Sequence, residues 1–514
     1  MTRRAAVAAT SPLAAQAGLD LVNEGGNAVD AAIAAMAVAT VAEPGVVSPM
    51  GGAFVNVWPA SGAPVVVDGN VSMPGRGAAA ERFGAGLREV TTSYGGGITL
   101  YAGPGSVATP GAFAAFGVAH ERFGAAPWAR LLEPAIAAAT NGFRLGAAAA
   151  RYLAITRDSV FGWDEQTRAF LSDGDGGIPA PGTSLRAPDL AAALSRVGER
   201  GWAELYTGEL GEALAADMAA RGGLLTRADL AAYRAVVRPA LVSGLRDWQV
   251  AANPPPSIGG PVLTAMLRLM GEFDDPAERA AAVVRVQRDV LRYRHGRLDR
   301  AVDLGEAGAE LVRRVSEAGL AGLATSSDTA HVSVVDSDGT ACAITASAGY
   351  GSGATVPGTG LMLNNCLGEP ELNRHGLHAL EPGTRLASNM APTTARRADG
   401  SVLAVGSPGA DRITTALMQV LSAFCLDGLP LQAAIDRPRL HVRVLDGEDL
   451  LLDHEDDPAL AGAVADAVAW AGMPVMVHQH RDMFFGGVGA ALRAGGGELV
   501  AAADVRREAA TAVG

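Results

Sequence analysis

The chain has 514 residues, with 41 lysines plus arginines against 54 aspartates plus glutamates, which gives a net charge of −13 at pH 7. Every one of the 41 cations is arginine, because the sequence contains no lysine. Enzymes that need a lysine amine, as a Schiff base, in a Walker-A loop or on a kinase strand, are therefore excluded. The acidic balance also argues against nucleic acid or an anionic membrane as the main partner, since both attract cationic surfaces.

The cysteines and the N-terminus indicate the cellular compartment. Cys342, Cys366 and Cys425 form no CxxC pair, which is typical of a reducing compartment. Arg3 and Arg4 resemble the start of a signal peptide, but no sufficiently strong apolar segment follows them. No run of about 18 apolar residues free of glycine and charge is present. A soluble, cytoplasmic protein is expected.

The first two thirds of the chain are predicted to be rich in helix, with one early hairpin. Ser11-Pro12 is typical of a helix start, and Gly25-Gly26 of a helix end. Mainly helices are expected at 106–240, a rigid loop at 253–260, and more helix to about residue 323. The first two helices and the two strands of the hairpin are expected at 11–23, 28–41, 53–58 and 65–68.

The pattern changes at Thr329, beyond which alternating apolar residues indicate strands. This order, helices, hairpin, helices and a strand-rich final third, favours an α+β or layered αββα fold over a regular βαβ alternation. The strands are expected at 331–335, 341–347, 360–363 and 402–405, and the helices at about 412–426 and 431–436.

Metal and phosphate chemistry have weak signals. The histidine pairs His375/His378 and His478/His480 have no further ligand nearby, so solvated surface histidines are expected. The glycine-rich segments at 349–353 and 486–489 cannot form a P-loop without lysine, and no GxSxG nucleophile elbow is present. No metal and no cofactor are expected.

Thr329 is the candidate nucleophile. A threonine hydroxyl needs a base beside it, and a threonine at the start of a chain supplies its own α-amine. The preceding segment 323–328 (LATSSD) has the composition of a cleavable surface loop, and a strand follows Thr329. The loop 406–411 precedes a helix, so its N–H groups are suited to an oxyanion hole. By spacing alone, an ordinary threonine at a strand edge remains the simpler interpretation.

A series of sequence blocks decides between these interpretations. They include EGGNAVDAA at 24–32, MGGAF at 50–54, PPPSIGG at 254–260, TAHVSVVDSDG at 329–339, GSPG at 406–409 and PRLH at 438–441. Further blocks lie at 109–111, 123–128, 133–135, 141–143, 222–226, 363–365, 381–383, 390–393 and 504–506. In this order and over nearly the whole chain, they resemble the γ-glutamyltransferases (γ-glutamyltranspeptidases), which are N-terminal nucleophile hydrolases.

The resemblance implies a self-processing enzyme. The fold would be a four-layer αββα sandwich, and the precursor would cut itself between Asp328 and Thr329. The large subunit (1–328) and the small subunit (329–514) would form one intertwined heterodimer, and two such heterodimers could pair. Thr329 would attack a carbonyl, with its α-amine as base. Ser347 matches a threonine that holds the nucleophile, and Gly409 and Ala410 match a Gly-Gly oxyanion hole.

The pocket for the glutamyl group departs from the family pattern. Asn70 stands where the family has the arginine that binds the α-carboxylate, unless Arg76 reaches the same place. Losing such a charge-assisted pair removes about 1.5–3 kcal/mol of binding free energy. The other residues expected to bind substrate are Asn365, Glu369, Ser388 and Asn389, with Glu369 at the position that receives the α-amine.

Several small-molecule reactions fit this pattern. The favoured hypothesis is hydrolysis of a C–C bond beside a keto group, which removes an oxo-acid fragment. Homologues of the family do this in 4-alkyl-L-proline biosynthesis, in pathways to pyrrolobenzodiazepines, lincosamides and hormaomycin. The alternatives are γ-glutamyl transfer or hydrolysis on glutathione-like amides, and another amide acylase activity. An inactive homologue that acts as a binding protein is a more remote alternative.

Overall fold

Thr329 leads directly into an inner strand of a seven-stranded antiparallel sheet. The computed structural model describes residues 3–92, 97–318, 329–445 and 449–514, so Asp328 and the end of the helix predicted to reach residue 323 lie outside the described residues. In sheet order the strands are β22 (Ala510–Val513), β1 (Ala5–Ala9), β11 (Ala330–Asp336), β12 (Ala341–Ser347), β2 (Gly52–Trp58), β3 (Val65–Gly69) and β8 (Val236–Pro239).

A second, six-stranded sheet packs against the first. Its strands in order are β21 (Leu499–Ala503), β20 (Gly489–Arg493), β16 (Val402–Gly406), β15 (Thr393–Arg397), β10 (Trp248–Ala252) and β9 (Leu241–Leu245). Strand β11 lies against β16 and β20, while helix α2 (Ala28–Ala42) contacts β11 and β12. Both faces of β11 are therefore covered, and every residue of this strand is buried.

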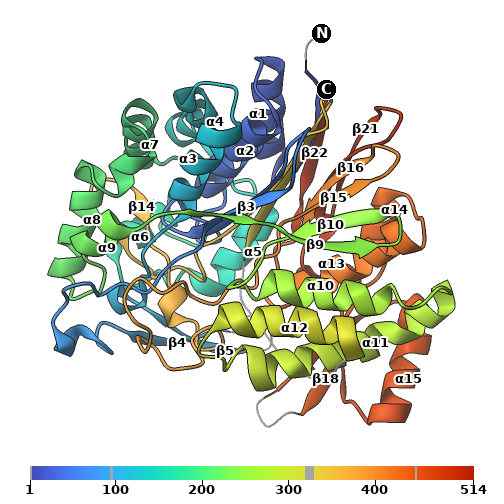
Figure 1. Cartoon of the computed structure of the whole chain (residues 1–514). Helices are drawn as coiled ribbons and strands as arrows, with labels where there is room; N and C mark the ends of the chain where they lie inside the picture. Colours follow the sequence, from blue (N-terminus) through green and yellow to red (C-terminus); the bar gives the residue numbers. More distant parts are fainter. Residues whose placement is uncertain (1–2, 93–96, 319–328, 446–448) are drawn as a thin grey trace.

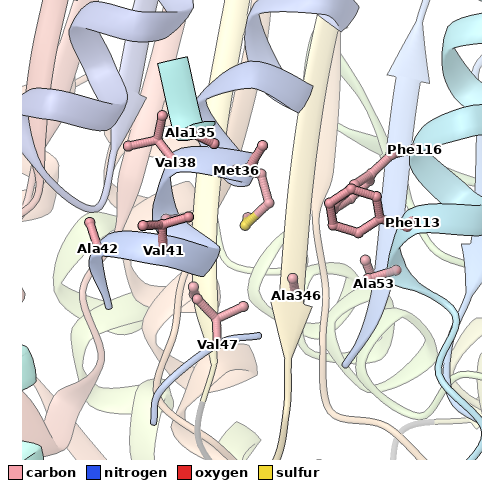
Figure 2. Packing of buried hydrophobic residues seen from close by; sticks show 14 of the residues in the cluster. Met36, Val38, Val41, Ala42, Val47, Ala53, Phe113, Phe116, Ala135 and Ala346 are labelled. Carbon is pink, nitrogen blue, oxygen red and sulfur yellow. The ribbon is translucent and has the colours of Figure 1, made fainter. Parts of the chain in front are cut away.

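Helix α2 is buried along its whole length because small side chains occupy most of its positions. Alanine allows a helix to lie close to a sheet, and the larger Met36 and Val41 fill the remaining space. Figure 2 shows Met36 of α2 beside the strand that carries Ala346 (β12), and Phe113 beside Ala53 of β2. Helix α1 (Pro12–Asn23) packs against α2 and against β1.

The remaining helices surround the two sheets (Figure 1). Those from α10 to α13 lie toward the second sheet, where α10 and α13 share a hydrophobic core with β15 and β16. The helices that precede α10 in the chain are α3 (Ala112–Phe123), α4 (Trp128–Asn141), α5 (Ala147–Thr156), α6 (Glu165–Phe170), α7 (Pro188–Arg200), α8 (Glu209–Ala220) and α9 (Arg227–Ala232). The helices from α10 onward are α10 (Gly259–Met270), α11 (Pro276–Tyr293), α12 (Leu304–Ala318), α13 (Arg412–Leu421), α14 (Leu431–Asp436) and α15 (Ala461–Ala471).

Smaller sheets complete the described structure. They pair β4 (Arg88–Thr92) with β5 (Ile98–Ala102), β6 (Phe143–Arg144) with β7 (Ser184–Leu185), and β13 (Thr355–Val356) with β14 (Leu361–Met362). A three-stranded sheet contains β17 (Leu440–Val444), β18 (Leu450–Glu455) and β19 (Val475–His478). Among the described residues, no helix is long and apolar enough to cross a lipid bilayer.

Side chains cap the starts of the first two helices, the first of them at Ser11 as predicted. Ser11 Oγ accepts a hydrogen bond from the N–H of Ala14, and Asn27 and Asp30 form a capping box at the start of α2. The first strand was not predicted, because its alanine-rich sequence has helical propensity. Pairing with β11 and β22 overrides that propensity in β1.

The prediction of solvated histidines is correct for His375 and His480 but wrong for their partners. His378 is buried because its Nδ1 accepts from the N–H of Gly84 and its Nε2 contacts the carbonyl of Gly105. His478 is partly buried because it hydrogen-bonds Asp453 at 2.7 Å and stacks on Phe484.

Candidate active site

Four strands of the first sheet bring their ends together beside Thr329. Ala330 pairs with Ala346, so Thr329, one residue earlier, lies opposite Ser347 in the same register. Ser347 pairs with Gly52, and the pairing of Ala53 with Gly69 places Asn70 opposite Gly52. Because neighbouring strands are about 4.8 Å apart, this row holds the backbones of Thr329 and Asn70 roughly 14 Å from each other.

The glycines of the MGG block make this row possible. A Cβ on Gly51 would lie 2.3 Å from the carbonyl oxygen of Ser347. A Cβ on Gly52 would lie 2.8 Å from the backbone nitrogen of Val71 and 3.1 Å from Asn70 Oδ1. Both positions therefore require glycine for close backbone approach.

A pocket, called the Thr329 pocket below, opens along this row. Five of the residues predicted to act with Thr329 are in its wall, and three, Asn365, Gly409 and Ala410, are not. The wall consists of Asn70, Val71, Thr329, Ser347, Cys366, Glu369, Leu372, Ala387, Ser388, Asn389 and Met390.

Asn365 has a different place. It is fully buried, its Oδ1 accepts from the N–H of Tyr350 at 2.6 Å, and its Nδ2 donates to the carbonyl of Tyr101. These bonds fix the turn that follows β12. The side chain thus supports the shape of the site from behind the wall of the Thr329 pocket.

No arginine is among the residues that line the Thr329 pocket in the described part of the chain. Arg76, the alternative to a cation at position 70, points elsewhere: its side chain is 46% exposed and lies beside Asp229. Glu369 is therefore the one charged side chain in this wall, and it is buried. Burial and the neighbouring Glu369 carboxylate raise the pKa of the Cys366 thiol, so Cys366 keeps its proton.

Two arginines lie behind Asn70, where both pair with the single carboxylate of Asp68. Asn70 Nδ2 donates to the backbone carbonyl of Leu386 at 2.7 Å. The backbone carbonyl of Asn70 accepts from the hydroxyl of Tyr233 at 2.6 Å. Arg385 stacks on the Tyr233 ring and pairs with Asp68 Oδ1 at 3.4 Å. Arg238 pairs with Asp68 Oδ2 at 2.9 Å.

The loop before α13 reaches Thr329 from the other side. Gly409 and Ala410 have φ angles of +123° and +69°, and a Cβ on Gly409 would lie 2.6 Å from Gly486 Cα. Their N–H groups meet no acceptor within the described ranges. Neither residue lines the Thr329 pocket, but their neighbour Pro408 shares a second cavity with Thr329.

Buried charges hold this loop in place. Asp411 accepts from His441 Nε2 at 3.1 Å, and His441 Nδ1 lies 3.1 Å from the hydroxyl of Thr415. Burial alone would raise the pKa of Asp411, but Arg412 and His441 outweigh it and hold that pKa well below its usual range. Asp411 is therefore an anion that anchors the residues next to Ala410.

His331 is unsuited to act as the base for Thr329. Its Nδ1 lies 2.8 Å from the hydroxyl of Thr345, and its Nε2 lies 2.7 Å from that of Ser333. Burial lowers the pKa of His331 to about 3, so the ring is neutral and both nitrogens are engaged.

Ala410 offers a test of the loop conformation. An alanine at a positive φ costs about 1 kcal/mol relative to glycine, so we expect Ala410→Gly to leave the free energy of unfolding unchanged or raise it by up to about 1 kcal/mol. Ala404→Gly, in strand β16, is the matched control and should lower it by about 1 kcal/mol. Urea unfolding of both variants measures this, and equal losses would contradict the loop conformation.

The comparisons with known proteins account for Thr329, the nearby hydroxyl of Ser347 and the loop of Gly409 and Ala410. A family model described as gamma-glutamyltranspeptidase matches residues 14–320 and 312–514. The chain belongs to this family. It is therefore an enzyme, an N-terminal nucleophile hydrolase of the hydrolase and acyltransferase type.

The relatives of this family member carry two kinds of name. The chain is 31% identical over 503 residues to the acylase ACY 1 proenzyme of Pseudomonas sp. (strain SE83), covering 92% of this chain and 87% of that protein. It is 30% identical over 486 residues to the glutathione hydrolase proenzyme of Escherichia coli (strain K12), covering 86% and 81%. Both names denote precursors.

Solved structures extend the likeness to the fold. A cephalosporin acylase from Bacillus halodurans matches with a TM-score of 0.79 and 25% identity, over 99% of this chain and 96% of that one. LmbA2991HD matches with the same TM-score and identity, over 99% and 98%. The mixed arrangement of helices and sheets predicted from the sequence is thus confirmed as the fold of these proteins.

Sequence reasoning missed one residue that lies beside the nucleophile. Glu43 follows α2 and lines the same second cavity as Thr329 and Pro408. In the sequence it is a single acidic residue before Pro44 at a predicted helix end, where acidic residues carry no functional signal. The packing of α2 against β11 brings that helix end close to Thr329.

Proposed function

We propose that this family member cuts itself between Asp328 and Thr329 and then uses Thr329 to hydrolyse a carbonyl compound that is not a γ-glutamyl amide. Thr329 Oγ attacks the carbonyl carbon, and the freed α-amine takes the proton. Ser347, opposite Thr329 in the sheet, positions the hydroxyl. The N–H groups of Gly409 and Ala410 stabilise the oxyanion.

The sheet pairing supports self-cleavage after which the two subunits stay together as one heterodimer. Strand β11 of the small subunit (329–514) pairs with β1 of the large subunit (1–328), and β12 pairs with β2. We infer that the two packed sheets and their helices form the four-layer αββα sandwich of N-terminal nucleophile hydrolases. The three cysteines are buried and free, which supports a cytoplasmic location.

The substrate proposal rests on the wall of the Thr329 pocket. Among the described residues that line this wall, Glu369 is the one with a charged side chain. A γ-glutamyl group would place its α-carboxylate in this pocket without a cation beside Asn70. The missing charge-assisted pair weakens binding of that group by about 1.5–3 kcal/mol. The pocket instead offers amide and hydroxyl groups from Asn70, Ser388 and Asn389.

A larger groove next to the Thr329 pocket supports a substrate that carries its carboxylate elsewhere. This outer groove shares Leu372 and Ala387 with the pocket and contains Arg238, Arg374 and Arg385. Its two carboxylates are already engaged: Asp299 pairs with Arg294, and Asp303 accepts two N–H groups at the start of α12. A carboxylate of the substrate fits these arginines.

The reaction we favour is hydrolysis of a C–C bond beside a keto group, as in the 4-alkyl-L-proline pathways to pyrrolobenzodiazepines, lincosamides and hormaomycin. Thr329 Oγ adds to the keto carbon, and the C–C bond breaks. The departing carbon of the pyrroline takes the proton from the Thr329 ammonium group. Water then hydrolyses the ester and releases the fragment as an acid whose new carboxyl carbon is the former keto carbon, while the pyrroline carboxylate lies in the outer groove.

Amide hydrolysis is the second candidate, and the names of two relatives favour it. One is called an acylase proenzyme and another a cephalosporin acylase. The same threonine and oxyanion hole serve an amide if the leaving amine takes the proton. In both candidates the small-molecule acyl group has no free α-carboxylate beside Asn70.

A three-substrate assay tests the proposal. The purified enzyme is given a chromogenic γ-glutamyl anilide, a vinylogous keto-acid pyrroline and a set of neutral N-acyl anilides. We expect slow release from the first and fast turnover of the second. Fast turnover of the third alone would establish the amide acylase instead. Fast γ-glutamyl release would contradict the pocket argument, and no turnover of any substrate would indicate a binding protein.

A further inference from the structure

A second cavity lies on the other side of Thr329. This Glu43 cavity has Thr329 in its wall but otherwise shares no residue with the Thr329 pocket. Glu43, Thr10, His331, Tyr152 and Arg507 are its polar lining residues.

Two polar atoms in this wall lack a well-formed hydrogen bond. Glu43 Oε1 and Thr10 Oγ1 are buried and make no hydrogen bond of good length and angle among the described residues, although the Thr10 hydroxyl lies near enough to the Glu43 carboxylate to lower its pKa. Such atoms are normally satisfied by bound water, and the cavity is large enough to hold it. The arrangement thus indicates water between Glu43 and the neighbourhood of Thr329.

Self-cleavage poses a chemical problem that this water solves. Before the cut, the nitrogen of Thr329 is part of a peptide bond, so the α-amine that serves the mature enzyme does not yet exist. The Thr329 hydroxyl still has to lose its proton when it attacks the preceding carbonyl. A different base is needed, and it must reach Thr329.

We propose that Glu43 is this base, and that it accepts the Thr329 hydroxyl proton through a water molecule in the Glu43 cavity. The proposal rests on the self-cleavage proposed above. Thr329 Oγ bonds to the carbonyl carbon of residue 328, the C–N bond breaks, and the proton passes back to the departing nitrogen. Water then hydrolyses the ester, which yields a carboxylate at residue 328 and restores the hydroxyl of Thr329.

The surroundings of Glu43 suit a base near neutral pH. Burial raises the pKa of Glu43 to about 7, with contributions from Thr10 and Arg507 that lower it and from Glu508 that raises it. Glu43 also follows the C-terminus of α2, where the helix dipole disfavours a negative charge.

The other groups that face the Glu43 cavity are not proton acceptors. His331 is neutral, with both ring nitrogens engaged by hydroxyl groups. The hydroxyl of Tyr152 donates to the carbonyl of Tyr350 at 3.0 Å. Arg507 is a cation whose Nε donates to the carbonyl of Met483. Glu43 is therefore the carboxylate of this cavity that is available to Thr329.

The test follows cleavage of freshly synthesised full-length chain, made in a cell-free system and then held at pH values from about 5 to about 9. For the wild type we expect a cleavage rate that rises with pH around about 7 and then levels off, because only the ionised carboxylate accepts a proton. Glu43→Gln should slow cleavage by about 100-fold or more and remove this rise.

Two neighbouring variants separate a proton-acceptor role from a structural one. Arg507→Gln removes a charge that lowers the pKa of Glu43, so the midpoint of the pH profile should move up. Glu508→Gln removes a charge that raises it, so the midpoint should move down. Neither shift depends on whether Glu43→Gln folds as well as the wild type.

The outcomes distinguish this inference from the proposed function. If the wild type never cuts itself, the self-cleavage proposal fails and the role of Glu43 fails with it. If the wild type cuts itself but Glu43→Gln does so at the same rate, only the role of Glu43 is overturned. An unchanged pH midpoint in both neighbouring variants overturns it as well.

Discussion

Thr329→Ala is expected to leave the protein as one uncut chain of 52.1 kDa, without hydrolase activity. The variant lacks the oxygen that attacks both the preceding carbonyl and the substrate, so cleavage and turnover fail together. Activity should fall by about 10³-fold or more. Denaturing gel electrophoresis and the substrate assay measure the two effects.

Thr329→Ser is the matched control for this change. Serine keeps the hydroxyl and, once cut, the α-amine, so this variant should still be processed and active. The wild-type pieces should migrate together in native gel filtration, since β11 and β12 pair with β1 and β2. An uncut but fully active Thr329→Ala protein would be incompatible with the proposed nucleophile.

Asn70→Arg is expected to raise kcat/KM for the γ-glutamyl anilide by about 10- to 150-fold. The new cation would stand in the wall of the Thr329 pocket, where it could pair with an α-carboxylate for about 1.5–3 kcal/mol. The change also removes the hydrogen bond of Asn70 to Leu386, so some loss of stability, about 1 kcal/mol, is expected.

Asn70→Gln separates the effect of charge from that of size. It lengthens the side chain without adding a cation and should not increase γ-glutamyl turnover. Steady-state kinetics on the processed variants provide the comparison. Equal rates for Asn70→Arg and Asn70→Gln would mean that charge at position 70 does not set the acyl specificity.

Much of the site could be predicted because its parts are local hairpins. Thr329 and Ser347 belong to one hairpin, and Asn70 follows the second strand of another, whose alternation and turns are visible in the sequence. What brings the hairpins together is the pairing of β12 with β2, a contact between residues about 300 positions apart. Single-sequence periodicity carries no information about such long-range pairing.

The features that were missed also depend on distant contacts. Strand β1 is alanine-rich and becomes a strand only between β11 and β22. The buried places of His378 and Asn365 result from backbone groups of remote loops. Glu43 becomes a candidate functional residue because it shares a cavity with Thr329, and segments from both proposed subunits form that cavity. A residue type and its immediate neighbours cannot reveal these surroundings.

The absence of lysine makes the central claim easy to measure. Trypsin cuts this chain only after arginine, so an uncut chain yields a single peptide that spans residues 315–374. Self-cleavage before Thr329 predicts two peptides in its place, 315–328 and 329–374, the second beginning with a free threonine amine. Peptide mass spectrometry of the purified wild type should find this pair. Recovery of only the intact 315–374 peptide would contradict the account.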